Sequence, residues 1–263
     1  MPGIIRKPLL PVALAVGLLL LLAGGAYALF PDTGEVADEL KAKYEELESW
    51  QVELGLNGTS EHTIQCWRDG DHWRQEWIAA TENGTRVVRA AVGSGQRIEG
   101  VYPASPSAPH PPLHLFWLKD PKQAWQWMAI RDQVMSYQFL EDRPCLVLGA
   151  EYGDPRSSQV WIDLERRVPL RLVAPSGITW RWSEYYSLGN HLLPTRLRIA
   201  FPQGKSFSFD VQWHQVGTEI DSSLFTANAL EEEFGWTESP EVDDPRMRFL
   251  WGDLPRGYST SVD

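Results

Sequence analysis

The sequence predicts a mainly β domain, in which about eleven antiparallel strands form a barrel or a sandwich, with a few helices beside them. Apolar and polar residues alternate along short segments, and the segment 206–213 has the cleanest period of two. Successive side chains of a strand point to opposite faces of a sheet, so each segment has one apolar face and one polar face. Pairs such as Asn57-Gly58 and Asn83-Gly84 separate the segments, because Asn and Gly tolerate the positive φ of tight hairpins.

The first group of strands lies between residues 50 and 102, and Pro103 ends it. The alternation predicts an antiparallel meander whose apolar face must be buried against another part of the chain. The residues that recur at period two are Trp50, Val52, Leu54, Leu56, His62, Ile64, Cys66, Trp73, Gln75, Trp77, Ile98, Gly100 and Tyr102.

The second group of strands lies between residues 133 and 213, with turns such as Gly153-Asp154-Pro155 and Gly189-Asn190. Its alternation again gives one apolar side to each strand. The apolar residues at alternate positions include Ile178, Trp180, Trp182, Leu197, Ile199, Phe201, Phe207, Phe209, Val211 and Trp213.

Two helices are predicted as covers for the sheet. The segment 32–48 begins with Asp32 as a cap and Glu35 three residues on, which resembles a capping box. Asp120-Pro121 starts a second, Trp-rich helix, since Asp caps helices and Pro suits the first turn. Between the two helices, residues 102–112 contain five prolines and are predicted to form a loop. His110 and His114 lie four residues apart without further ligands nearby in the sequence, so no metal site is expected. The residues expected to face the sheet as a lid are Leu40, Tyr44, Trp127 and Met128.

The charge pattern excludes some partners. The chain has 263 residues, enough for one sizeable domain, and a formal net charge of −11. The segment 231–244 contains seven acidic residues and no basic residue. Residues 229–263 are therefore predicted to be an acidic, flexible tail. An acidic body repels phosphate backbones and anionic lipid headgroups, which argues against nucleic acid and against electrostatic attachment to a membrane.

The N-terminus predicts export. Arg6 and Lys7 precede an apolar run from Leu9 to Leu22, and Ala26-Tyr27-Ala28 fits the small-x-small pattern of a signal-peptidase site. Residues 1–28 are therefore either a cleaved signal peptide or an uncleaved membrane anchor, since 8–30 is long enough to span a bilayer. Both alternatives place the body outside the cytoplasm.

Cys66 and Cys145 are the two cysteines of the chain. In an oxidising compartment they are candidates for a disulfide. The alternative is two separate buried thiols, because free Cys is often buried. The sequence leaves both possibilities open.

Several segments together resemble the LolA-like family of periplasmic lipoprotein carriers and outer-membrane lipoprotein-sorting proteins. The resemblance covers 32–228, and it depends on the order of the motifs more than on any one of them. The helix runs into a strand through Leu47-Glu48-Ser49-Trp50, and a turn rich in basic and aromatic residues follows. The other matching segments are 67–74 (WRDGDHWR), 94–103 (SGQRIEGVYP), 161–164 with Val168-Pro169, and the closing 220–225 (IDSSLF).

The resemblance implies an unclosed antiparallel β-barrel with a helical lid over a hydrophobic cavity that holds acyl chains in the periplasm. It also implies inner-membrane partners that release cargo and outer-membrane partners that receive it, a monomeric carrier, and a lid-holding arginine that corresponds to Arg68. The lining expected for the cavity is Trp50, Val52, Leu54, Trp73, Trp77, Ile98, Trp180, Trp182, Leu197, Ile199, Phe207, Phe209 and Val211.

The sequence therefore predicts a lipid or lipoprotein carrier that is not an enzyme and needs no cofactor or metal. No His-Glu-x-x-His, Gly-x-Ser-x-Gly, phosphate-binding Gly loop or Cys-x-x-Cys is present. Asp163 and Glu165 lie two apart, as a hydrolase pair would, but such a pair more often belongs to a solvated strand face, here near Arg166 and Arg167. Two other functions remain: an envelope-stress sensor or protein-interaction module with the same fold, and a Trp-lined carbohydrate-binding β domain.

Overall fold

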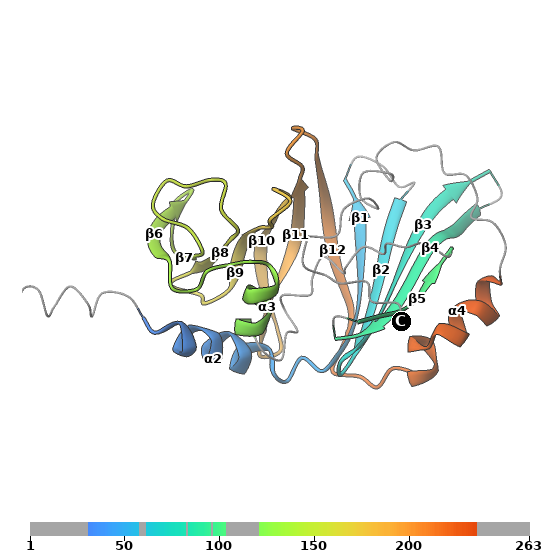
Figure 1. Ribbon diagram of the computed structural model, residues 1–263. Helices are drawn as coiled ribbons and strands as arrows, with labels where there is room; N and C mark the ends of the chain where they lie inside the picture. Colours follow the sequence, from blue (N-terminus) through green and yellow to red (C-terminus); the bar gives the residue numbers. More distant parts are fainter. Residues whose placement is uncertain (1–30, 58–61, 83, 96, 104–120, 236–263) are drawn as a thin grey trace, which may run out of the picture.

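The computed structural model describes residues 31–57, 62–82, 84–95, 97–103 and 121–235 (Figure 1). The predicted signal segment or anchor, the loop with His110 and His114, and residues 236–263 of the predicted tail lie outside these ranges. Within them, no helix has the length and apolar character needed to cross a membrane.

Twelve strands and three α-helices make up the described part of the chain. The first half contains α2 (Thr33–Tyr44), β1 (Ser49–Leu56), β2 (His62–Asp69), β3 (His72–Thr81), β4 (Gly84–Ser94) and β5 (Arg97–Tyr102). The second half contains α3 (Pro121–Trp127), β6 (Met135–Leu140), β7 (Arg143–Leu148), β8 (Gln159–Asp163), β9 (Pro169–Val173), β10 (Thr179–Leu188), β11 (His191–Ala200), β12 (Ser206–Val216), the 3-10 turn η2 (Ser222–Phe225) and α4 (Ala227–Phe234).

All twelve strands form one antiparallel sheet that does not close into a barrel. The order is β5-β4-β3-β2-β1-β12-β11-β10-β9-β8-β7-β6, so the first and last strands of the chain are neighbours in the middle. β5 and β6 form the two edges and do not pair with each other. The predicted mainly β, unclosed barrel is confirmed, with twelve strands where the turn spacing indicated about eleven.

The two faces of the sheet differ in the residues they carry and in the helices that pack on them. In register, Trp50 lies opposite Arg68, and Leu54 lies opposite both Ile64 and Val211. Paired residues of an antiparallel sheet share a face. We name the face that carries Trp50 and Leu54 the inner face, and the face that carries Arg74 and Glu76 the outer face.

Helices α2 and α3 pack with the inner-face core. The carboxylate of Asp32 accepts a hydrogen bond from the Gly34 N–H at 2.6 Å, which confirms the predicted cap. The helix ends at Tyr44, four residues before the predicted end. The helical residues within the main core cluster are Val36, Ala37, Tyr44 and Trp125, and Met128 joins them from the turn that follows α3.

Helix α4 packs on the outer face over β4 and β5, at the opposite end of the sheet from α2 (Figure 1). Leu230 and Phe234 contact a cluster of Ala90, Val92 and Tyr102, and the rings of Tyr102 and Phe234 stack at 4.7 Å. Residues 229–235 therefore belong to a packed helix and its cap, and the tail boundary expected after residue 228 falls inside it.

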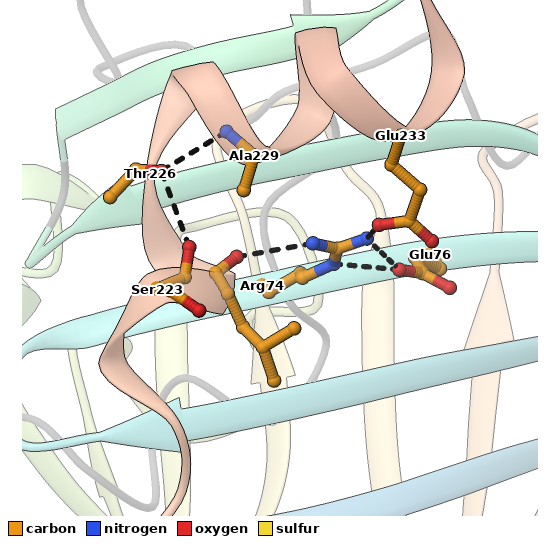
Figure 2. A network of polar contacts seen from close by, with 7 residues as sticks. Arg74, Glu76, Ser223, Thr226, Ala229 and Glu233 are labelled. Atoms are coloured by element: carbon orange, nitrogen blue, oxygen red, sulfur yellow. Dashed lines mark hydrogen bonds and ion pairs between the residues drawn. The ribbon is translucent and has the colours of Figure 1, made fainter.

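A buried arginine fastens α4 to β3 (Figure 2). Arg74 is 2% exposed; its Nε donates to the Glu76 carboxylate at 2.6 Å, and its Nη2 donates to Glu233 of α4 at 2.5 Å. Its Nη1 donates to the Leu224 carbonyl of η2 at 3.2 Å. Burial raises the pKa of the Glu76 carboxyl, and the Arg74 charge opposes this. The guanidinium therefore compensates a carboxylate that the protein interior would otherwise disfavour.

The two cysteines are separate, buried thiols in this structure. Cys66 is on β2 and Cys145 is on β7, with six strands between them in the sheet order. The register also places them on opposite faces, since Cys66 pairs with Val52 whereas Cys145 pairs with Asp163. Of the two possibilities that the sequence left open, the structure has the free thiols.

Substituting Arg74 by Met should lower the free energy of unfolding by about 3–5 kcal/mol, because Glu76 would be left as a buried, uncompensated charge. Urea denaturation of the mature protein measures this loss. Glu233→Gln is the matched control: the Glu233 side chain is 50% exposed, so its loss should cost about 1 kcal/mol or less. Equal losses in both variants would contradict the assigned role of Arg74.

The folded protein should react very slowly with Ellman's reagent at neutral pH. Burial raises the pKa of Cys145 to about 11 and that of Cys66 further still, and the thiolate is the reactive form. In denaturant without reductant, both thiols should react. Absence of reactive thiols in the unfolded, unreduced chain would instead show that a disulfide had formed.

Candidate functional site: the inner face of the open sheet

The register brings the predicted lining residues onto one continuous face. Across the middle of the sheet, Leu197 lies opposite both Trp182 and Phe209, and Ile199 lies opposite both Trp180 and Phe207. Leu54 carries the same face into the first half of the sheet, where it lies opposite both Val211 and Ile64. The remaining members follow through Val52, Trp50, Trp77, Trp73 and Ile98.

Most of these side chains belong to one buried apolar cluster, with Trp180 packed against it. Trp73 and Ile98 form a smaller cluster with Ala91 and Val101 on the same face, nearer the β5 edge. The apolar inner face is therefore present as a structural unit, and the role of its residues in binding is a proposal.

The inner face continues beyond the predicted residues. Trp180 lies opposite Leu172, which lies opposite Val160, which in turn lies opposite Leu148. These strands were predicted, but their residues were not assigned to the site. At the β6 edge, Phe139 is 72% exposed, so the apolar row reaches the surface there.

The structure describes the side chains of three of the four predicted lid residues, and all three pack with the main apolar cluster. Met128 is fully buried and Leu40 packs against the main cluster. The Tyr44 hydroxyl donates to the Leu192 carbonyl at 3.0 Å, which joins α2 to the β10–β11 hairpin. The side chain of Trp127 lies outside the described part of the structure.

Arg68 holds the connection between α2 and β1. Its Nη1 donates to the Leu47 carbonyl at 2.7 Å and its Nε donates to the Gly70 carbonyl at 2.8 Å. Burial lowers its pKa to about 10, and the acidic side chains of Asp71 and Glu48 partly oppose this. The side chain thus ties backbone at the end of the helical cover to the sheet, and its role as a lid-holding residue is taken up as a proposal below.

The inner face also carries polar residues on β2–β4 that sequence reasoning did not assign to the site. His62, Gln75 and Arg89 are buried there, at positions that alternate with outer-face residues. Burial lowers the pKa of Arg89. Gln75 follows the period of the neighbouring tryptophans in the sequence, so its presence on this face had a visible signal.

The acidic pair at the end of β8 has a structural role. Asp163 is buried, accepts hydrogen bonds from the backbone N–H groups of Glu165 and Arg166 at 2.9 Å, and lies 3.6 Å from Arg143. Glu165 is exposed. The solvated face suggested for this pair is wrong for Asp163, which caps the β8–β9 turn. Within the described ranges, no three His, Cys, Asp or Glu residues are grouped as metal ligands would be.

Comparisons with known proteins bear on the fold. No protein-family model matches the sequence, and no curated protein matches it. Among solved structures, a proposed outer membrane lipoprotein-sorting protein domain from Vibrio parahaemolyticus aligns with a TM-score of 0.50 and 15% identity, over 75% of this chain and 97% of that one. A LolA superfamily protein from Nitrosomonas europaea aligns with a TM-score of 0.48 and 15% identity, over 74% and 99% of the two chains. At such identities the likeness concerns architecture alone: this chain shares the fold of the lipoprotein-sorting domain, which agrees with the resemblance seen in the sequence.

Proposed function

We propose that this protein is an exported carrier that shields acyl chains of lipids or lipoproteins against the inner face of its open sheet. The observation that carries the proposal is the continuous apolar inner face, built from both halves of the chain, in a sheet whose edges do not close. Burial of an alkyl chain contributes about 0.8 kcal/mol per CH2. Binding of this kind needs no catalytic group, cofactor or metal.

The apolar run of residues 9–22 supports export, and the LolA-like fold supports a place in the periplasm. A periplasmic carrier that works as a monomer would take cargo from a releasing protein of the inner membrane and pass it to a receiver at the outer membrane. An uncleaved N-terminal segment would keep the protein at the inner membrane.

Uptake requires the cover to move. Trp50, Val52 and Leu54 are fully buried, so a chain can reach them only if the packing over the inner face opens. The α2 end of that cover is held by the neutral Tyr44–Leu192 hydrogen bond and by Arg68 on the α2–β1 connection. We therefore assign Arg68 the role of the lid-holding residue.

Delipidated mature protein should take up a fluorescent fatty-acid probe saturably, and Ile199→Asp should weaken this uptake at least tenfold. Ile199 is on the inner face, and a carboxylate beside an alkyl chain must be desolvated. Probe fluorescence titration measures the affinity, and circular dichroism with urea denaturation reports whether each variant is folded. Phe207→Asp, on the strand paired with Ile199, is a second variant.

Gln212→Asp is the matched control, since it adds the same charge at an exposed outer-face position of β12; it should bind the probe as the wild type does. Folded wild-type protein that takes up no probe would overturn the carrier proposal and favour a sensor or protein-interaction module. Quenching of Trp fluorescence by soluble glycans, without probe uptake, would instead favour carbohydrate binding.

A further inference from the structure

One polar side chain of the inner face has unmet hydrogen-bonding capacity. Gln75 lies on β3 between Trp73 and Trp77 on the same face and is 0% exposed. Within the ranges that the structure describes, neither its Oε1 nor its Nε2 has a hydrogen-bond partner. A buried amide without partners is destabilising, and such groups in native proteins usually mark an unseen water or a ligand.

The immediate neighbours of Gln75 cannot satisfy it. Across the sheet its partners in register are Cys66 and Ala91; a thiol is a weak donor and acceptor, and an alanine side chain is neither. Arg74 and Glu76, the adjacent residues of β3, point to the outer face and bond each other there. The amide therefore lies inside a mostly apolar surface and faces whatever occupies the inner side.

The other buried polar residues make this region distinct from the rest of the inner face. Arg89 lies opposite Trp77, diagonal to Gln75 on the neighbouring strand, and His62 lies opposite Ala79 on the other side. The buried acids Glu76 and Asp163 belong to the outer face, since they lie opposite Gln65 and Cys145. A polar group of a ligand that binds here would therefore be neutral or negatively polarised, with oxygen atoms that accept hydrogen bonds.

We propose that Gln75 is a polar anchor that hydrogen-bonds the carbonyl linkage of a bound acyl lipid, with an N-acyl amide preferred over an ester. The inference deepens the proposed function and rests on it. A hydrocarbon satisfies neither atom of the Gln75 amide. An ester carbonyl accepts from Nε2, and an amide both accepts from Nε2 and donates to Oε1, so it satisfies both. A site built to hydrogen-bond its ligand discriminates strongly against an analogue that lacks the group.

The test compares three ligands with the same number of chain atoms: N-methyldecanamide, methyl decanoate and dodecane. Each displaces the neutral dye N-phenylnaphthylamine from the delipidated mature protein, and displacement curves give relative affinities. We define the amide preference as the affinity for the amide divided by the affinity for dodecane, because the ligands differ in the cost of desolvation as well as in hydrogen bonding. In Gln75→Met, which keeps side-chain length but not the hydrogen bonds, the amide preference should fall at least tenfold, and the corresponding ratio for the ester should fall less, while dodecane binds as before.

Gln65→Met is the control, because Gln65 is the corresponding residue of β2 on the outer face; it should keep the amide preference. Gln75→Leu replaces Gln75→Met if the latter does not fold. An amide preference that survives in the folded Gln75 variant overturns the anchor but leaves the carrier intact. Displacement by none of the three ligands in the wild type overturns the carrier proposal, and the anchor with it. A Gln75 variant that loses stability in urea and keeps the amide preference identifies a structural, water-bound amide and also overturns the anchor.

Discussion

The structure depends on side-chain alternation being kept in register across twelve strands. A shift of one residue in any pairing would move the apolar set of that strand from the inner face to the outer face. The strand pairing is nevertheless irregular in places: the register shifts at bulges between Gln51 and Val52, between Trp77 and Ile78, and between Val92 and Gly93. A bulge bends its strand and increases local twist, so these positions curve the sheet while the apolar face remains continuous. Curvature and continuity together make an inner face that a long apolar guest could occupy.

The strands that were easy to predict are those with one covered face. β1 and β12 alternate buried residues with partly buried or exposed ones over most of their length, and their sequences show the same period. β4 and β8 do not alternate, because both of their faces are covered. The outer face of β4 is covered by α4. On the outer face of β8, the Gln159 amide donates to the Asp154 and Ser157 carbonyls, and Arg171 lies over the Trp161 ring. A cover contributed by a distant segment leaves no period in the strand that it covers.

The same reason explains why the site was only partly predictable. The sequence identified the apolar lining, because each member obeys the local alternation. The alternation also places Arg74 and Glu76 on the polar face, yet both are buried. Glu233, 159 residues further along the chain, packs there and bonds Arg74. Gln75 was visible at an apolar position between two tryptophans, but its lack of a partner depends on the packing of three strands. Burial of polar groups is a tertiary property, and the local pattern records only which face each residue occupies.

The two covers of the sheet differ in what it costs to remove them, and this difference favours exchange on the inner side. Detaching α4 would separate Glu233 from Arg74, at a cost of about 1 kcal/mol or less, and it would also uncover the apolar cluster of Leu230, Phe234 and Tyr102. On the inner side, Tyr44 donates a neutral hydrogen bond, typically about 1 kcal/mol, and the Glu39–Arg167 pair is substantially exposed, which makes it weaker still. Lys43 of α2 also donates to the Arg166 carbonyl, and its own carbonyl lies 3.3 Å from the His191 ring. Apolar packing of Val36, Ala37 and Tyr44 adds to these contacts, and an incoming acyl chain can replace that packing with contacts of the same kind. The inner helices are therefore the part of the fold that a lipid on the inner face can displace at the smallest net cost.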